Sequence, residues 1–255
     1  PMERIETAEA LAGLMNAARP RWSNCYRLPE DLHKAVEAGR LYAHRQPGAL
    51  MLLEEWPDVF QVCALVYDVA APCEAPCVAK PLLAECITRG GPVEPGFAAF
   101  WAGLGMRPAG TRRMLENTHP AGASRPARFP VQAADAARLK EAKMLFADSL
   151  ERLTVRLPWR MEESDVLCAL DDQGNLAGAL HFSHERGVGT LEHLAVRPDL
   201  RRRGVAGTLM ARWLELPVGA RRRLWVLEEN LPAAALYERW GFADTGRRCH
   251  SLLRT

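Results

Sequence analysis

The sequence predicts an α/β (α+β) protein built from two tandem halves of similar layout. Helical and strand patterns alternate along both halves, and a segment with three prolines, His119–Pro130, separates them. Gly105–Gly110 follows an aromatic-bearing helical segment and precedes an arginine pair, and Gly241–Gly246 has the same surroundings 136 residues later. These matching ends indicate an internal duplication.

The second half has the clearer pattern of elements. Two apolar runs flank the turn residues Asp-Asp-Gln-Gly-Asn, which predicts a β-hairpin. Pro232 suits the first turn of the last helix, and Gly241 suits its end. The expected elements are a helix over Val131–Leu150, strands over Asp165–Leu170, Leu176–His184 and Thr190–Val196, a helix over Arg203–Leu216, a strand over Arg223–Leu227, a helix over Pro232–Trp240 and a strand over Cys249–Leu253.

The first half repeats this order in outline. Apolar runs on either side of the turn Arg-Gln-Pro-Gly indicate strands, and Pro29 suits a helix start. The expected elements are helices over Leu11–Arg19 and Leu28–Ala38, strands over Leu41–His44, Ala49–Glu54 and Phe60–Tyr67, and helices over Pro81–Thr88 and Gly96–Leu104.

Composition limits the classes of protein. With 255 residues, 48% apolar and 25% charged, the chain resembles a soluble globular protein of one large or two small domains. No apolar run approaches the roughly 20 residues of a membrane helix, and the acidic N-terminus is not a secretory signal, so we expect no membrane partner. The net charge of +2 argues against a general nucleic-acid binder. Only four of the 33 basic residues are lysines, which is typical of a GC-rich, bacterial genome.

The cysteines indicate the compartment and argue against a metal. Their number is seven, which is odd, and no secretory signal precedes them, so we expect reduced thiols and a cytoplasmic protein. Cys73 and Cys77 form a C-x3-C pair with neither a second pair nor a following pair of histidines, so no metal site is expected.

One segment carries the chemistry. Leu194–Met210 has the pattern of a strand, a tight loop Arg-x-x-Gly-x-Ala-Gly and a helix start. Gly and Ala leave backbone amides accessible, and the helix start adds unpaired donors and the positive end of its dipole. Arg201, Arg202 and Arg203 raise the positive potential, and Thr208 adds a hydroxyl. Such a nest favours a pyrophosphate; the Gly-Lys-Ser/Thr of a P-loop and the G-x-G-x-x-G of a dinucleotide site are absent.

Two motifs resemble those of a known family. Val196-x-Pro198-x-x-Arg201-x-x-Gly204-x-Ala206 resembles the coenzyme A loop of the GCN5-related N-acetyltransferase (GNAT) superfamily. Further on, Asn230-x-x-Ala233-x-x-Leu236-Tyr237-x-x-x-Gly241-Phe242 resembles the second signature of that family. The two occur in the family's order, and the match covers about Asp165–Leu253.

The resemblance implies two tandem acyl-CoA N-acyltransferase-type domains, each a mixed, mostly antiparallel sheet flanked by helices. It implies acetyl-CoA as cosubstrate, with the pantetheine arm in a gap between two strands, against the backbone of Leu194, Ala195 and Val196. The other cofactor-binding residues that it implies are Arg201, Arg202, Arg203, Gly204, Val205, Ala206, Gly207, Thr208, Asn230, Ala233 and Tyr237.

The implied reaction is direct attack of an amine on the thioester in a ternary complex. Tyr237 matches the tyrosine that is often assigned as general acid to the departing sulfur, and a phenol with a pKa near 10 suits that role; the alternative is that it only packs in its helix.

Glu192 is the candidate general base. It lies on the strand before the loop, where period two places it on one face with Thr190 and Leu194, and it needs a raised pKa or a water relay. The alternative is a surface glutamate. His193 is the second candidate base, and His181 and His184 are candidates for lining the acceptor cleft.

The first half departs from the family pattern. The segment after its third strand, DVAAPCEAPCVAK, lacks the Arg-x-x-Gly-x-Gly/Ala pattern, and its prolines remove amide donors. We therefore expect a degenerate GNAT-like domain without the coenzyme A loop over residues 1–118, a linker over 119–130 and the catalytic domain over 131–255. This arrangement resembles tandem acetyltransferases with one degenerate domain.

The predicted function is transfer of an acetyl group from acetyl-CoA to a primary amine of a small molecule or amino acid. Three alternatives stay open: a protein amine as acceptor, a non-catalytic coenzyme A sensor, and RNA binding through Arg201–Arg203 and Arg221–Arg223. The sequence leaves open the acceptor's identity, the acyl length and the choice between monomer and homodimer.

Overall fold

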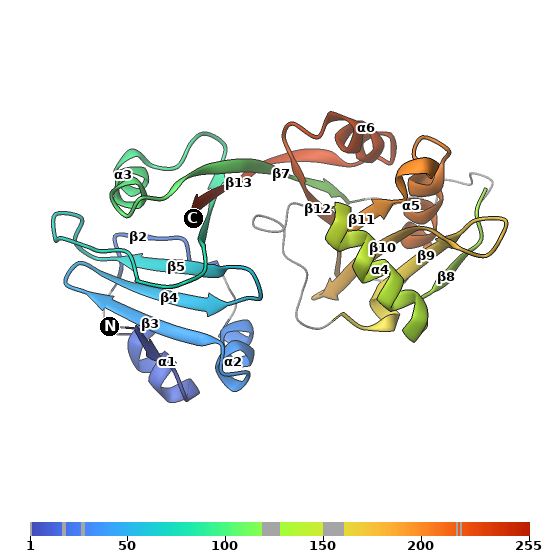
Figure 1. Ribbon diagram of the computed structural model, residues 1–255. Coiled ribbons are helices and arrows are strands. Elements are labelled where there is room, and N and C mark those ends of the chain that lie inside the picture. Colours follow the sequence, from blue (N-terminus) through green and yellow to red (C-terminus); the bar gives the residue numbers. More distant parts are fainter. Residues whose placement is uncertain are drawn as a thin grey trace. The chain divides into compact units, whose positions relative to one another are not determined.

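The chain folds into two compact units of mixed α/β structure (Figure 1). The computed structural model describes residues 2–16, 19–26, 29–118, 128–149, 161–217, 219 and 221–255. Unit 1 comprises Pro1–Thr111 and Arg247–Thr255, and unit 2 comprises Arg112–Gly246. None of the helices in the described ranges has the length and apolar character needed to span a bilayer.

Unit 1 is a mostly antiparallel sheet in the order β1-β3-β4-β5-β6-β13, with β5 and β6 parallel. Leu11 and Val36 join one hydrophobic cluster with the sheet, and Phe97 and Trp101 join another. Its elements are β1 (Met2–Arg4), α1 (Ala8–Met15), β2 (Trp22–Ser23), α2 (Pro29–Glu37), β3 (Leu41–Gln46), β4 (Ala49–Glu55), β5 (Phe60–Val66), β6 (Leu82–Arg89) and α3 (Pro95–Gly103).

Unit 2 has a sheet in the order β7-β12-β11-β10-β9-β8, with β11 and β12 parallel. Its largest hydrophobic cluster joins the sheet to the two helices that follow β11 and β12. Its elements are β8 (Val131–Ala133), α4 (Ala136–Ser149), β9 (Val166–Leu170), β10 (Leu176–Glu185), β11 (Val188–Val196), α5 (Val205–Glu215), β12 (Arg221–Leu227) and α6 (Leu231–Arg239), and short 3₁₀ turns span Glu163–Asp165 and Pro198–Leu200. Strands β7 (Arg107–Asn117) and β13 (Ala243–Arg254) each belong partly to unit 1 and partly to unit 2.

The two halves of the sequence exchange their last strands. Residues Arg247–Arg254 of β13 pair with β6 and so complete the sheet of unit 1. Residues Arg112–Asn117 of β7 pair with β12 and so complete the sheet of unit 2. The domains expected from the sequence, over 1–118 and 131–255, remain a prediction. The compact units have other bounds, because unit 2 begins at Arg112 and unit 1 includes Arg247–Thr255. Most of the expected linker, residues 119–127, lies outside the described residues.

Two expected helices are wrong in part or in whole. Pro81–Thr88 is not a helix: Leu82–Arg89 is strand β6, and its first five residues are all buried. A strand buried on both faces is continuously apolar, and periodicity cannot distinguish it from a buried helix. The expected helix over Val131–Leu150 begins with strand β8, and α4 starts only after Asp135, whose carboxylate accepts a hydrogen bond from the Arg138 amide at 2.8 Å.

A glycine sets how closely α5 approaches the sheet. A Cβ atom on Gly178 of β10 would lie 2.8 Å from Cγ1 of Val205, the first residue of α5, and 2.9 Å from the carbonyl oxygen of Ala195. Both distances are too short for real contacts, so only glycine allows the start of α5 to pack at this depth.

We expect Gly178→Ala to lower the free energy of unfolding by about 1–3 kcal/mol, because the added methyl group forces β10 and α5 apart. Urea denaturation measures this. Gly13→Ala in α1 is the matched control: its Cβ meets open space, so the change should be neutral or stabilising by about 1 kcal/mol. Equal destabilisation by both substitutions would contradict the packing argument.

Two buried histidines face each other across β10 and β11. Nδ1 of His181 lies 3.0 Å from Nδ1 of His193, and the rings stack with centroids 5.3 Å apart. Phe146 of α4 packs on His193, with ring centroids 5.6 Å apart. Burial, with the charge of Lys143, lowers the pKa of His181 to about 4, so this imidazole is neutral near pH 7.

Stability should therefore fall in mild acid. The folded pKa of His181 lies below the ordinary value of 6.5, so the unfolded chain takes up the proton first as pH falls. Full stabilisation is present above pH 6.5, and up to about 3 kcal/mol is lost as pH approaches 4. Urea unfolding across this range should show a shallower decline for His181→Gln. His184→Gln, at an exposed position on the same strand, should follow the wild-type slope. Parallel curves for all three proteins would refute the assignment.

Candidate functional site

The sheet of unit 2 opens between β11 and β12. The two parallel strands pair from Val188 with Arg221 to Leu191 with Leu224, and no pairing joins them beyond that point. β11 nevertheless continues to Val196, and β12 continues to Leu227. On its other edge β11 stays paired with β10, where Leu194, Ala195 and Val196 lie opposite Leu180, Ala179 and Gly178. The β12-facing edge of Glu192–Val196 is thus available to an extended ligand.

A β-bulge marks the point where the strands part. Leu191 lies opposite Phe182 and His193 lies opposite His181, so Glu192 is an extra residue without a partner in β10. The bulge shifts the alternation of faces: Leu191 and Leu194 both join the cluster beneath α5. The period-two expectation that Thr190, Glu192 and Leu194 share a face is therefore wrong.

Glu192 is held by its neighbours but reaches solvent. Ser183 Oγ donates a hydrogen bond to Glu192 Oε1 at 2.5 Å. Desolvation by the surrounding protein raises the pKa of Glu192, and the Ser183 hydrogen bond and the charges of Arg223 and Arg112 oppose that rise. The side chain remains exposed, which limits the desolvation. A carboxylate with a raised pKa that solvent can reach is able to take up a proton from a ligand.

The loop after β11 presents a row of backbone donors. Gly204 caps α5 with φ of +99°, and Arg202 has φ of +61°, so the chain turns sharply before the helix. Within the described residues, the amides from Arg202 to Gly207 donate to no carbonyl or side chain. α5 runs for 11 residues behind them, so the positive end of its dipole lies at the loop. Successive free amides at a helix start form an anion site.

The side chains around this loop play different parts. Arg201, Arg202 and Arg203 are exposed, and Arg201 Nε donates to the Val196 carbonyl at 3.3 Å. The Thr208 hydroxyl and amide both donate to the Gly204 carbonyl, at 3.2 and 3.0 Å. The role of Thr208 in binding a cofactor stays a prediction. Arg128, which sequence reasoning missed, donates to the Arg203 carbonyl at 3.4 Å and adds a positive charge.

Helix α6 contributes the second motif. Asn230 Oδ1 accepts from the Ala233 amide at 3.2 Å, so Asn230 is the helix N-cap and its side-chain oxygen is engaged in capping. Ala233 is partly buried against the core of unit 2, and its small side chain leaves space on that face. Leu231, beside the cap, is 68% exposed.

Tyr237 lies on the inner side of α6. Its ring is buried in the core of unit 2 and tilts against Phe242 with centroids 6.1 Å apart. Burial raises the pKa of Tyr237 well above 10, so the phenol keeps its proton. Its hydroxyl has no hydrogen-bond partner in the described part of the chain. A neutral phenol without a partner is able to donate to a ligand atom.

The other histidines are engaged elsewhere or exposed. His193, the second candidate base, is buried against His181 and Phe146 and does not share the surroundings of Glu192. His181 is buried with it, and His184 is exposed near the C-terminal end of strand β10. Sequence reasoning missed Ser183, Arg112 and Arg223 as neighbours of Glu192. Of these three, only Ser183 could have been found from the sequence, because the predicted hairpin places it opposite Thr190, close to Glu192.

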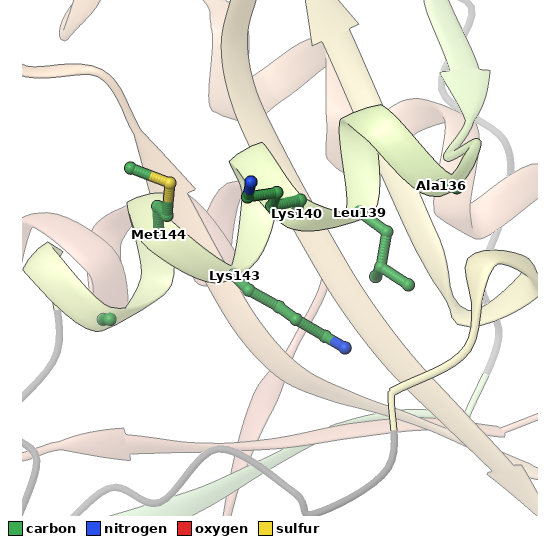
Figure 2. Close-up of a pocket in the computed structure, with 6 residues that line it drawn as sticks. Ala136, Leu139, Lys140, Lys143 and Met144 are labelled. Atoms are coloured by element: carbon green, nitrogen blue, oxygen red, sulfur yellow. The ribbon is translucent and has the colours of Figure 1, made fainter.

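A separate hollow runs along α4. Its volume is about 510 Å³, and its described lining residues all belong to that helix. Figure 2 shows Lys140, Lys143 and Met144 projecting from α4. None of the lining residues belongs to β11, the α5 loop or α6, so the hollow is not part of the candidate site. The residues of the lining are Ala136, Leu139, Lys140, Lys143, Met144 and Ala147.

Metal-binding geometry is not found in the described ranges: no three His, Cys, Asp or Glu side chains gather as a ligand set.

Known proteins share the sequence pattern and the fold. Residues 134–242 match the model of the acetyltransferase (GNAT) family. A search of curated proteins gives no match. Solved structures with a similar fold include a GCN5-related N-acetyltransferase from Kribbella flavida, with TM-score 0.60 and 17% identity over 87% of this chain and 93% of that chain.

Two further structures cover both units. A GCN5-related N-acetyltransferase from Sphaerobacter thermophilus gives TM-score 0.59 and 15% identity over 100% of this chain and 95% of that one. A tandem GNAT protein from the clavulanic acid biosynthesis pathway gives TM-score 0.58 and 15% identity over 100% and 98%. At such identities the likeness concerns the fold. Residues 134–242 of unit 2 thus match the acetyltransferase (GNAT) family, a family of acyltransferases, and the fold of the whole chain is similar to that of a tandem GNAT protein.

Proposed function

We propose that unit 2 binds acetyl-CoA and transfers its acetyl group to a primary amine of a small molecule or amino acid, by direct attack in a ternary complex. One observation carries the proposal: the opened strand edge of β11 leads directly into a loop of free amides at the start of α5. An extended chain ending in a pyrophosphate has the shape and charge for this arrangement.

The residues present fit the cosubstrate. Amides from Arg202 to Gly207 would bind the diphosphate, with Arg201 to Arg203 and Arg128 supplying positive charge. The edge of Leu194–Val196 would pair with the amides of the pantetheine arm, and Ala233 would leave room beside it. When bound, acetyl-CoA supplies a thioester carbonyl that an amine can attack.

Glu192 would accept the proton of the incoming ammonium. It lies at the bulge where the strands part, and solvent reaches it, so a water molecule can relay the proton. Its raised pKa makes it a better base than an ordinary carboxylate. Ser183 would act as a positioning residue, because it holds one carboxylate oxygen in place.

Tyr237 would donate its proton to the departing sulfur. The raised pKa keeps the phenol protonated until a strongly basic thiolate forms nearby. The general acid would thus come from α6, the helix that follows β12, and the general base from β11.

Unit 1 would take no part in binding the cosubstrate. Residues 67–81, which join its parallel strands β5 and β6, contain no helix, so this crossover lacks the helix N-terminus that α5 provides in unit 2. All seven cysteines are free thiols, which supports a reducing, cytoplasmic setting.

The direct test is an assay of thiol release from acetyl-CoA with a panel of small amines, amino acids and peptides. We expect acceptor-dependent release with at least one small amine. Saturable binding of acetyl-CoA without release for any acceptor would favour a coenzyme A sensor. Absence of binding at millimolar concentration would refute the proposal.

Tyr237→Phe should lower kcat by about 100-fold while leaving the Kd for coenzyme A nearly unchanged, because it removes the proton donor and keeps the buried ring. Steady-state kinetics and calorimetry measure the two effects. Tyr67→Phe, in unit 1, is the matched control and should leave both values unchanged. A parallel loss of affinity in Tyr237→Phe would show a binding role and not an acid role.

Ser183→Ala should move the acidic limb of the kcat/KM profile to higher pH. The Ser183 hydrogen bond lowers the pKa of Glu192, so its removal raises that pKa and delays formation of the free base as pH increases. Ser164→Ala, at an exposed serine of the same unit, should leave the profile unchanged. An unshifted profile for Ser183→Ala would separate Glu192 from proton transfer.

A further inference from the structure

The sheet of unit 1 opens in the same manner as that of unit 2. Parallel strands β5 and β6 pair from Phe60 with Leu82 to Val62 with Ala84. β5 then continues to Val66 and β6 to Arg89 without further pairing between them. The strand order leaves β5 and β6 as the counterparts of β11 and β12, so unit 1 has the opening that unit 2 is proposed to use.

A segment of the chain itself pairs with the edge of β5 that β6 leaves unpaired beyond Val62. Strand β2 pairs antiparallel with β5, with Trp22 opposite Val66 and Ser23 opposite Leu65. The Arg21 amide donates to the Val66 carbonyl at 2.7 Å, and the Asn24 amide donates to the Ala64 carbonyl at 3.4 Å. The free edge of β5 is thus satisfied by backbone groups, as an added strand satisfies a sheet edge.

The side chain of Asn24 bridges the opening. Its Nδ2 donates to the Val62 carbonyl on β5 at 3.0 Å and to the Glu85 carbonyl on β6 at 3.1 Å. Its Oδ1 accepts from the Ala64 amide at 2.6 Å. Asn24 is only 5% exposed. A single amide group therefore meets the polar backbone of both diverging strands.

A polar cluster continues from Asn24 into the gap. The Tyr26 hydroxyl hydrogen-bonds Glu85 Oε2, and Gln61 Nε2 donates to Tyr26 Oη at 2.9 Å and to Glu85 Oε2 at 3.1 Å. Gln61 and Glu85 are buried. The segment is therefore tied to β5 and β6 by side chains as well as by backbone.

Helix α3 shows a matching change. In α6 the N-cap Asn230 accepts from the amide of Ala233, and in α3 the N-cap Glu94 accepts from the amide of Phe97 at 3.0 Å. Counting from these caps, Phe97 occupies the position of Ala233, and Trp101 that of Tyr237. The small residue beside the opening of unit 2 is thus replaced by a large buried one in unit 1, and the phenol by an indole.

The ring of Trp22 occupies the remaining space beside α3. It stacks on Phe97 with centroids 5.9 Å apart and an interplanar angle of 26°. A Cβ atom on Gly96 would lie 2.8 Å from Trp22 Cζ2, so the ring rests directly on the helix backbone.

We propose that residues 21–26 are a built-in occupant of the opening in unit 1, lying where acetyl-CoA lies in unit 2, so that each chain binds one acetyl-CoA, in unit 2 only. The proposal rests on the proposed function of unit 2. In unit 1 the backbone of this segment and the side chains of Asn24 and Trp22 make the contacts that unit 2 would make with a ligand.

Calorimetric titration of the full chain with acetyl-CoA measures the number of binding sites per chain. One site per chain is expected. Two sites would overturn this inference and leave the proposed function intact, and no binding would overturn the proposed function itself.

Ala233→Phe gives unit 2 the residue that unit 1 carries. It should abolish binding altogether, with circular dichroism and thermal unfolding confirming that the chain still folds. Saturable binding of acetyl-CoA that persists in this variant with wild-type affinity would show a second site outside the opening of unit 2 and would overturn the inference.

Hydrogen exchange locates the occupant independently of binding. Peptides over residues 60–66 should exchange equally with and without saturating acetyl-CoA, whereas peptides over residues 202–209 should become protected. Asn24→Ala should accelerate exchange at residues 60–66 at least tenfold. Ser23→Ala is the control, because among the described residues the Ser23 hydroxyl bonds only to the nearby Cys25 amide, and it should cause no such change. Protection of residues 60–66 by acetyl-CoA, or no effect of Asn24→Ala, would contradict the proposal.

Discussion

Parallel strands β11 and β12 stay paired over four residues and then part, and the chemistry proposed for unit 2 depends on that parting. A parallel pair shares one row of backbone hydrogen bonds, so its end leaves the donors and acceptors of β11 without a strand partner. The bulge at Glu192 lies at this point, and the strand runs on into the amides before α5. The candidate site is therefore built chiefly from main chain, and Glu192 and Tyr237 are the side chains proposed to act there.

Each unit has a strand edge that is left unpaired where its parallel strands part, and the two units differ in what covers that edge. An unpaired strand edge inside a folded unit is costly unless something bonds to it. In unit 1 the segment around Asn24 bonds to it permanently, and Phe97 and Trp22 fill the adjoining space. In unit 2 the equivalent helix carries Ala233, and the crossover between the parallel strands contains helix α5, which starts at Gly204. Two units of similar layout can thus cover a strand edge in one case and leave it open in the other.

The local parts of this molecule were predictable from sequence, and the long-range parts were not. The loop at Gly204 and the helix start at Pro232 have short patterns because a tight turn and a helix start impose residue types directly. The bulge at Glu192 left no such trace, since inserting one residue changes the register without changing composition. Strand β6 was mistaken for a helix because burial on both faces removes periodicity. The role of Asn24 depends on two strands far along the chain.

The exchange of end strands has a consequence for synthesis of the chain. The sheet of unit 1 is completed by residues Arg247–Arg254, which the ribosome makes after all of unit 2. Until those residues emerge, the edge of β6 has no partner, and a bare strand edge is a template for wrong pairing. The first unit to be translated is therefore the last to be finished. Maturation of the two units is coupled, although each has its own hydrophobic interior.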